Sequence, residues 1–267
     1  MTYAQASENT PSDPGSEGSF PALRRADRPP GRRASLASMV VGELVDDIVG
    51  GRFAIDSVLP REAELGARFG VSRTVVRESV KLLQDRGLVQ SHQGVGTVVR
   101  EFDAWDLIDD EVLAALVRHD ESRAILDELV AVRAGLERDM AFSAAAVGGA
   151  GLATVRDAYR RMEECRDDPA SFGRADVRFH DAVMRLSGNR LGRVIVNRIH
   201  DKARATGRYH GAVTPDAVAL TLAEHGGVVR ALEDADPEGA ALAMHAHITG
   251  SWARRRPGGA AGRAAQG

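Results

Sequence analysis

One aspartate and three histidines in the second half of the chain carry side chains that can bind a divalent metal ion. Asp176 and His180 are four residues apart, so both side chains project from one face of a helix. His225 and His247 lie in two later segments with helical periodicity, and in an antiparallel bundle they can complete a set of three imidazoles and one carboxylate. Such a set suits Zn, Ni, Mn or Fe and leaves coordination positions for water or a chelating substrate.

Spacing alone does not decide this site. An aspartate followed by a histidine four residues later arises often by chance, and a lone histidine on a helix is more often a hydrogen-bonded core residue than a ligand. His245 competes with His247 for the last ligand position. The other histidines are interpreted as hydrogen-bonded core residues that do not bind metal: His92, His119, His200 and His210.

A metal with open positions also admits catalysis, because bound water can become a hydroxide nucleophile. The sequence shows no convincing general base beyond the ligand set, so we expect a protein that is not an enzyme. A metal-dependent hydrolase is the alternative.

Residues 59–99 contain the start and stop signals of two short helices followed by a β-ribbon. Pro60 is favourable at the start of a helix and Gly70 at its end, and Ser72 is a typical cap for the next helix. Beyond Gly87 the pattern changes to short strands joined by a glycine-bearing tip. This order predicts a winged helix-turn-helix, with strands at residues 88–89 and 97–99.

The second helix of this element presents basic side chains near its N-terminal end. Arg73 and Arg77 share a helix face, and Thr74 lies beside them. A helix-turn-helix places these positions in the major groove, where an arginine can bond a guanine edge in bidentate fashion. The chain as a whole has a net charge of −3, but basic side chains outnumber acidic ones in residues 61–86, so a local positive face is expected.

The remaining chain divides by composition. With 267 residues it exceeds the usual size of one domain. Cys165 is the only cysteine, and there is neither a signal-peptide pattern nor a long apolar run, so we expect a soluble cytoplasmic protein without a membrane segment. The expected units are a disordered tail (1–33), a winged helix (34–100), a helical bundle (101–253) and a second disordered tail (254–267).

Periodic apolar residues separated by Gly, Asp-Pro and Asn signals predict that the bundle contains only helices. The fold class is thus mainly α, with an N-terminal winged helix-turn-helix and an all-α bundle. The expected bundle helices are residues 105–118, 121–146, 152–166, 171–186, 190–206, 215–233 and 237–252.

The winged-helix segment resembles the DNA-binding domain of the GntR family of bacterial transcription regulators. The resemblance rests on Leu59-Pro60, Glu62-Ala63-Glu64-Leu65, Gly70-Val71-Ser72-Arg73, Val76-Arg77-Glu78 and Leu83-Gln84-Asp85-Arg86-Gly87-Leu88. It implies contacts to bases or phosphates from the helix residues, and an approach of Gly94 to the minor groove. Ala63 stands where many members have arginine, and Arg61 is a candidate to compensate. The residues assigned to DNA recognition are Arg61, Ser72, Arg73, Thr74, Arg77, His92, Gln93 and Gly94.

Residues 103–252 resemble the helical effector domain of the FadR-type branch of that family. The resemblance implies that Asp176, His180, His225 and His247 bind a divalent metal, with Zn, Ni and Mn preferred. His247 is chosen over His245 because the family pattern places a histidine just before the apolar position of Ile248.

Arg133 and Glu137 match an arginine–glutamate pair of the same domain. Arg133 is therefore assigned to effector binding through a carboxylate, and an intrahelical salt bridge is the alternative.

A finer resemblance, carried by residues 62–65 and 105–113, is to members that regulate galactonate and other sugar-acid catabolism. It implies an aldonate effector, with lactate, glycolate and citrate as alternatives. We therefore expect a homodimeric repressor, paired through its helical domain, that leaves a near-palindromic operator when a small carboxylate binds. The competing hypotheses are a hydrolase with a vestigial DNA-binding domain and a constitutive DNA-binding protein without an effector.

Overall fold

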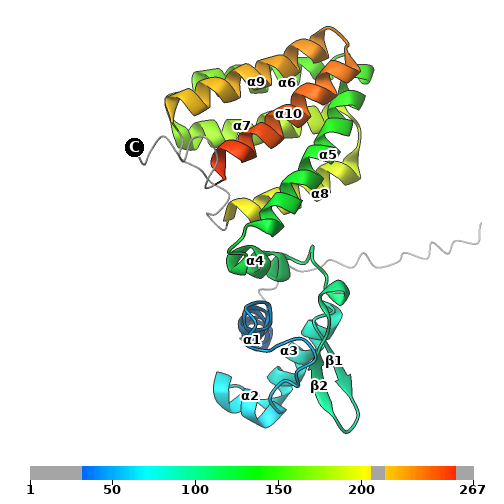
Figure 1. Cartoon of the computed structure of the whole chain (residues 1–267), viewed down its shortest axis with the longest axis vertical. Helices are drawn as coiled ribbons and strands as arrows, with labels where there is room; N and C mark the ends of the chain where they lie inside the picture. Colours follow the sequence, from blue (N-terminus) through cyan, green and yellow to red (C-terminus); the bar gives the residue numbers. More distant parts are fainter. Residues whose placement is uncertain (1–31, 206–213, 257–267) are drawn as a thin grey trace, which may run out of the picture.

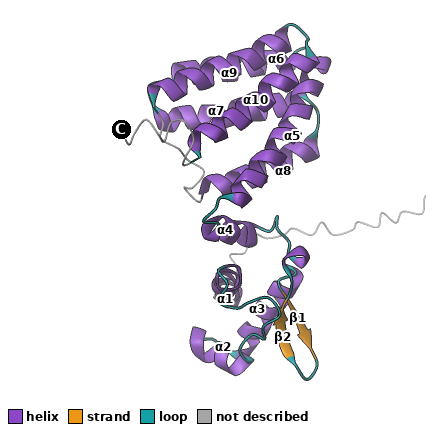
Figure 2. Cartoon of the chain, viewed as in Figure 1, coloured by secondary structure: helices purple, strands orange, loops and turns teal. Residues whose placement is uncertain are grey.

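The computed structural model describes residues 32–205 and 214–256, which form two lobes joined end to end (Figure 1). The N-terminal lobe contains the strands of the described segments, and the other lobe is built from helices (Figure 2). Most of the two expected disordered tails lies outside the described residues. Helices nevertheless extend into both tail ranges, since the first helix begins at Arg32 and the last ends at Arg255.

Three helices and an antiparallel ribbon form the N-terminal lobe, as predicted for a winged helix. They are α1 (Arg32–Val49), α2 (Glu62–Phe69), α3 (Arg73–Asp85), β1 (Val89–His92) and β2 (Gly96–Val99). The sequence-based prediction lacked α1, although its buried residues recur at helical spacing. These residues are Val40, Val41, Leu44, Val45 and Ile48.

The turn between α2 and α3 contains the predicted helix-ending glycine and helix-capping serine. Gly70 has a φ of 65°, the left-handed conformation that ends α2. Ser72 caps α3, because its hydroxyl accepts a hydrogen bond from the backbone N–H of Val75 at 3.4 Å. The expected apolar stripe of α3 is buried at Val75, Val76 and Leu83 and half-buried at Val80 and Leu82.

Helix α2 begins two residues later than predicted, at Glu62 and not at Pro60. The carboxylate of Glu64 reaches back and accepts a hydrogen bond from the backbone N–H of Arg61 at 2.9 Å. Arg61 thereby becomes the residue that precedes the helix, and Pro60 lies outside it.

The prediction of a helix from residue 105 is wrong at its start, because α4 covers Asp110–His119. The side chain of Asp109 accepts hydrogen bonds from the backbone N–H groups of Glu111 and Val112, at 3.0 and 3.2 Å, and so fixes where the helix begins. Ahead of it, the indole N–H of Trp105 donates to the carbonyl of Arg100 at 3.0 Å. The connector is therefore held by its own tertiary contacts and does not continue the helix.

Six further helices form the bundle, and their bounds lie within three residues of the predicted ones. They are α5 (Ala124–Val147), α6 (Gly151–Glu164), α7 (Pro169–Leu186), α8 (Arg190–Ala205), α9 (Pro215–Glu233) and α10 (Pro237–Arg255). Three of them begin with the same device, a capping side chain followed by proline, supplied by Asp168, Thr214 and Asp236.

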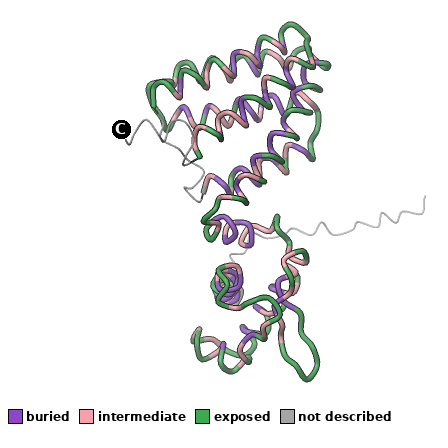
Figure 3. The backbone as a smooth tube through the Cα atoms, in the orientation of Figure 1, coloured by how far each residue is buried: buried purple, intermediate pink, exposed green. Residues whose placement is uncertain are grey.

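The two lobes have separate cores, and α4 contributes to both (Figure 3). Val112, Ala115 and Leu116 face the N-terminal core, whereas Leu113 and Val117 belong to the bundle core. Among the helices of the described segments, none combines the length and the apolar character that a bilayer crossing requires.

We expect Gly87→Ala to lower the free energy of unfolding by about 2 kcal/mol or more. Gly87 has a φ of 74°, and a Cβ there would overlap the carbonyl of Ala104 in the connector. Gly94→Ala is the matched control, because Gly94 has a φ of 79° but open space around it, so that only the backbone cost of about 1 kcal/mol applies. Urea unfolding of both variants measures the difference, and equal losses would contradict the close approach.

Candidate metal centre and DNA-binding surface

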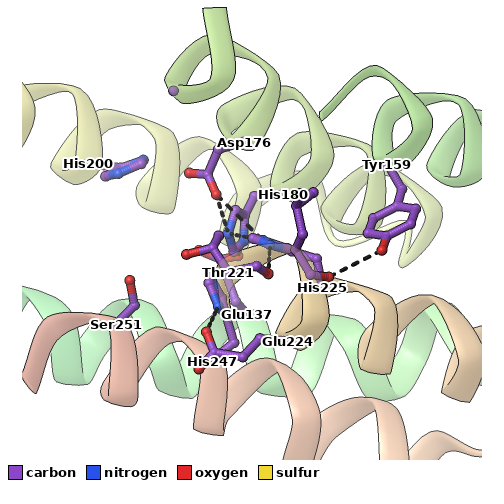
Figure 4. A network of polar contacts seen from close by, with 12 residues as sticks. Glu137, Tyr159, Asp176, His180, His200, Thr221, Glu224, His225, His247 and Ser251 are labelled. Atoms are coloured by element: carbon purple, nitrogen blue, oxygen red, sulfur yellow. Dashed lines mark hydrogen bonds and ion pairs between the residues drawn. The ribbon is translucent and has the colours of Figure 1, made fainter. Parts of the chain in front are cut away.

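Three helices of the bundle bring the four candidate ligands together (Figure 4). Asp176 and His180 project from α7, His225 from α9 and His247 from α10. One possible ligand atom from each residue lies within 4.8 Å of the others. The three imidazoles are buried, while the Asp176 side chain is 21% exposed. The four residues that the sequence analysis selected as candidate metal ligands therefore form one compact cluster.

Each imidazole of this cluster uses its Nδ1 atom for a contact pointing outward. His180 Nδ1 lies 2.5 Å from a carboxylate oxygen of Glu137, and His247 Nδ1 lies 2.9 Å from one of Glu224. His225 Nδ1 donates to the carbonyl of Thr221 at 2.8 Å. With Nδ1 engaged in this way, the Nε2 atom of each ring is left for the interior. Carboxylate and carbonyl partners on the second nitrogen are typical of metal-binding histidines.

The inward atoms meet one another at distances that suit a shared cation. His180 Nε2 and His225 Nε2 are 3.2 Å apart, and the Asp176 carboxylate lies 3.5 Å from the latter and 3.9 Å from the former. Two facing imidazole nitrogens and a carboxylate form a donor set that a divalent ion can satisfy at once. The residues present therefore fit a metal ion.

The electrostatics keep this donor set ready to bind. Burial lowers the pKa of His225 well below the usual value for histidine and also lowers the pKa of His247, so that both rings are neutral near pH 7. Burial opposes the charge of Asp176, but the imidazoles around it outweigh this and hold the pKa of its carboxyl well below its usual range. The site then offers an anionic carboxylate beside the neutral rings of His225 and His247.

Arg133, which the sequence assigned to effector binding, lies next to this cluster on α5. Its Nε atom donates to Glu137 at 2.5 Å, so the intrahelical salt bridge that was the alternative interpretation is present. Its Nη1 atom lies 3.3 Å from His200 Nε2 on α8. Arg133 and His180 together outweigh the effect of burial and hold the pKa of the Glu137 carboxyl well below its usual range. Glu137 therefore joins the arginine to a candidate metal ligand.

The structure separates the competing histidines. His245 is exposed on α10, whereas His247 faces the cluster. The interpretation as core residues is wrong for His92 and His119, because both are exposed and lie away from the cluster, and His119 contacts Asp46 at 3.1 Å. His210 lies outside the described residues.

Sequence reasoning missed two neighbours of the site. His200 was interpreted as a hydrogen-bonded core residue, which describes its contact with Arg133, but not its place beside the site. Glu224 directly precedes His225, yet its partner is His247 on the next helix, and no local spacing rule reveals that contact.

The residues assigned to DNA recognition are all exposed. They are Arg61, Ser72, Arg73, Thr74, Arg77, His92, Gln93 and Gly94. One of them already has a partner, since Arg77 on α3 forms an ion pair of 2.9 Å with Glu62 on α2. Both side chains are largely exposed, so this pair contributes at most about 1 kcal/mol and can be exchanged for a contact to DNA.

Comparison with known families assigns the winged helix and the helical bundle to one class of protein. Residues 36–99 match the bacterial regulatory proteins of the gntR family, and residues 128–250 match the FCD domain. A transcriptional regulator of Mycobacterium tuberculosis, Rv0494, is 31% identical over 229 residues, which cover 84% of this chain and 90% of that protein. This chain belongs to the GntR family.

Other relatives of this GntR protein agree. The galactonate operon transcriptional repressor of Escherichia coli is 28% identical over 214 residues, covering 79% of this chain and 93% of the repressor. The solved structure of Lar, which controls the agr system of Listeria monocytogenes, has 18% sequence identity and a TM-score of 0.50, over 81% of this chain and 94% of Lar, and supports the fold alone. The predicted winged helix followed by a helical bundle is confirmed.

The GntR protein is therefore a DNA-binding transcriptional regulator and not an enzyme, since its family and its relatives are regulators. The hydrolase alternative loses its support. The FCD match includes all four residues of the candidate metal cluster.

We expect Glu224→Gln to weaken Zn²⁺ binding by about 10-fold to 100-fold. The Glu224 carboxylate orients the His247 ring and makes it a more basic ligand, and the variant loses both effects. Competition with a chromophoric chelator measures the affinity. Glu164→Gln is the control, since Glu164 forms an exposed ion pair with Arg161 away from the cluster. Equal Zn²⁺ affinity in both variants would show that Glu224 does not support a ligand.

The metal-free protein should lose stability as the pH falls from 7.5 to 5.5. Burial, aided by Arg133 at His200, keeps the pKa of His225 and His200 well below the value of about 6.5 expected in the unfolded chain. In this range the unfolded state binds protons that the folded state does not. The free energy of unfolding therefore falls by up to about 1.4 kcal/mol per pH unit for each histidine.

Urea unfolding in EDTA at several pH values measures this slope. His200→Gln should flatten it, whereas His245→Gln, at an exposed position, should leave it unchanged. A stability independent of pH in the wild-type protein would contradict the burial of neutral imidazoles.

Proposed function

We propose that this GntR regulator is a repressor that releases operator DNA when a small carboxylate binds at a metal ion in the bundle. The observation that supports this most strongly is the convergence of three imidazole Nε2 atoms and one carboxylate, with a buried arginine next to them. A constitutive DNA-binding protein has no need of such an arrangement, which costs desolvation of several polar groups.

The metal ion would be held by Asp176, His180, His225 and His247. Three imidazole nitrogens and one carboxylate suit Zn, Ni or Mn, and four protein ligands leave two positions of an octahedral shell. When bound, the ion supplies positive charge and open coordination positions to an acid. The protein supplies the orientation of the ligands through Glu137, Glu224 and the backbone of α9.

Arg133 is proposed as the second contact of the effector. Arg133 is 5% exposed, and its guanidinium lies between Glu137 and His200, on the side of the cluster formed by α5 and α8. An arginine matches a carboxylate in geometry as well as in charge. A ligand that reaches both the metal and Arg133 must therefore be a small anion.

A sugar acid is the proposed effector class. An aldonate has a carboxylate and an adjacent hydroxyl, which together can chelate a metal ion. The relationship to a galactonate operon repressor supports this class. Lactate, glycolate and citrate have the same two groups and are the alternatives.

On the DNA side, we propose a cytoplasmic homodimer in which the helical domain (101–253) forms the interface. Each winged helix (34–100) then reads one half of a near-palindromic operator. The proposed contacts come from Arg61 and Ser72, which directly precede α2 and α3, from Arg73, Thr74 and Arg77 of α3, and from the wing residues His92, Gln93 and Gly94. Release follows by linkage, because an acid that binds the DNA-incompetent arrangement more tightly shifts the population toward it.

We expect one acid from a panel of aldonates, lactate, glycolate and citrate to raise the thermal unfolding temperature of the Zn²⁺-loaded protein, and EDTA to abolish the effect. A ligand at 100 times its Kd stabilises the folded state by about 2.7 kcal/mol. Differential scanning calorimetry with and without EDTA is the measurement.

Arg133→Lys is the matched variant for this experiment. It keeps the positive charge beside Glu137 but loses the planar fork that matches a carboxylate. It should retain the response to Zn²⁺ alone and lose the response to the acid. No response to any acid in metal-loaded wild-type protein would rule out the carboxylate sensor and favour the constitutive DNA-binding protein.

A further inference from the structure

The ion pair between Arg77 and Glu62 holds one edge of the arginine side chain. The Nε atom of Arg77 lies 3.0 Å from one carboxylate oxygen of Glu62 and 2.9 Å from the other. With the described residues, neither Nη1 nor Nη2 of Arg77 forms a hydrogen bond or an ion pair. The arginine side chain is 70% exposed. Its two terminal nitrogens are therefore left to donate to another molecule.

Arg77 differs in this respect from the other basic residues of α3. Arg73 and Lys81 are also exposed, but neither forms a side-chain hydrogen bond or an ion pair with a described residue. A long cation without a partner can follow the phosphates of a duplex, which carry no sequence information. A cation whose one edge is held in place can instead present its donors in a fixed direction.

The position of Glu62 is itself set by the helix-turn-helix. Glu62 is the first residue of α2, and the contact of the Glu64 carboxylate with the backbone N–H of Arg61 fixes where that helix begins. Leu65, one turn further along α2, is buried in the core of the N-terminal lobe. The carboxylate that holds Arg77 therefore comes from a fixed backbone and not from a loop.

The charge of Glu62 changes what Arg77 binds best. The carboxylate neutralises the guanidinium, so the pair has little net attraction to the phosphate backbone, which supplies the sequence-independent part of the affinity for DNA. The O6 and N7 atoms of guanine are uncharged acceptors whose spacing matches two parallel N–H groups of an arginine. A carboxylate beside Arg77 therefore favours a guanine edge over a phosphate.

Contact with DNA favours keeping this pair, although it is weak in the free protein. If Arg77 left Glu62, the carboxylate would remain near a polyanion without a counter-charge. Removal of water from the interface also strengthens the attraction between the two charged groups. Arg77 can keep its Nε contact and bind a base with its Nη atoms at the same time.

We propose that Glu62 is a specificity-determining residue of DNA recognition. Its carboxylate holds Nε of Arg77 and directs the two Nη atoms to O6 and N7 of one guanine in each half of the operator. Glu62 acts through Arg77 and is therefore a positioning residue. The inference rests on the contact of Arg77 with DNA that is part of the function proposed above.

Selection of bound duplexes by the full-length protein tests this role, from a library with about 20 randomised base pairs, enough for two half-sites one helical turn apart. Sequencing gives the base preference at each position. In the wild-type protein, one position of each half-site should favour guanine by about tenfold or more. Glu62→Gln should lower that preference several-fold and leave the other positions unchanged, because an amide places an N–H₂ group where Nε needs an oxygen.

Two matched variants make the selection specific. Arg77→Lys keeps the charge but lacks the planar fork, and it should lose the guanine preference at the same position as Glu62→Gln. Glu78→Gln removes one negative charge from α3, but Glu78 is exposed and contacts no described side chain, so its base preferences should equal those of the wild-type protein. Urea unfolding should show that all three variants fold with nearly unchanged midpoints, because each change lies at the surface.

The outcomes separate the role of Glu62 from the DNA contact on which it rests. If Glu62→Gln keeps the full guanine preference, the ion pair is exchanged on binding and the inference is wrong. If Arg77→Lys weakens binding to all duplexes alike, Arg77 contacts phosphate, so the inference is wrong while the proposed contact stands. If Arg77→Lys changes neither affinity nor preference, the proposed contact fails, and the role of Glu62 fails with it.

Discussion

The burial of three imidazoles and the carboxylate of Glu137 inside an apolar bundle is the constraint on which the rest of this structure depends. A buried polar group without a partner is costly, so each member of the cluster must be oriented by another. Helices α5, α7, α9 and α10 each contribute one or more of these members. The positions of the four helices are therefore tied together by the cluster as well as by the apolar core.

Small residues make this arrangement possible. Gly226, next to His225, leaves room for the hydroxyl of Tyr159, which donates to the carbonyl of Leu222 and joins α6 to α9. On α5, alanines at several core positions allow α7 and α10 to approach closely. With few aromatic residues in the chain, close backbone packing replaces side-chain volume.

At the junction between the lobes, one helix also serves more than one purpose. Helix α4 is shared by two cores, and its acidic start satisfies a helix N-terminus while it binds cations from both sides. The position of α3 is thus set by contacts of a helix that also packs against the helical bundle. A regulator of this kind needs such a shared element, because a ligand can shift an equilibrium only through contacts that differ between two states.

The sequence by itself determined most helix boundaries, the winged helix and the Asp176–His180 pair, because caps, glycine turns and i,i+4 spacing are local properties of the chain. It failed to predict α1, although the periodicity was present, and it placed the start of α4 too early. Only the tertiary structure decided that Glu224 contacts His247, that His200 contacts Arg133, and that Asp110 pairs with Arg198 of α8. The physical reason is that these contacts join different helices, whose relative rotation is set by packing and leaves no fixed spacing in the sequence.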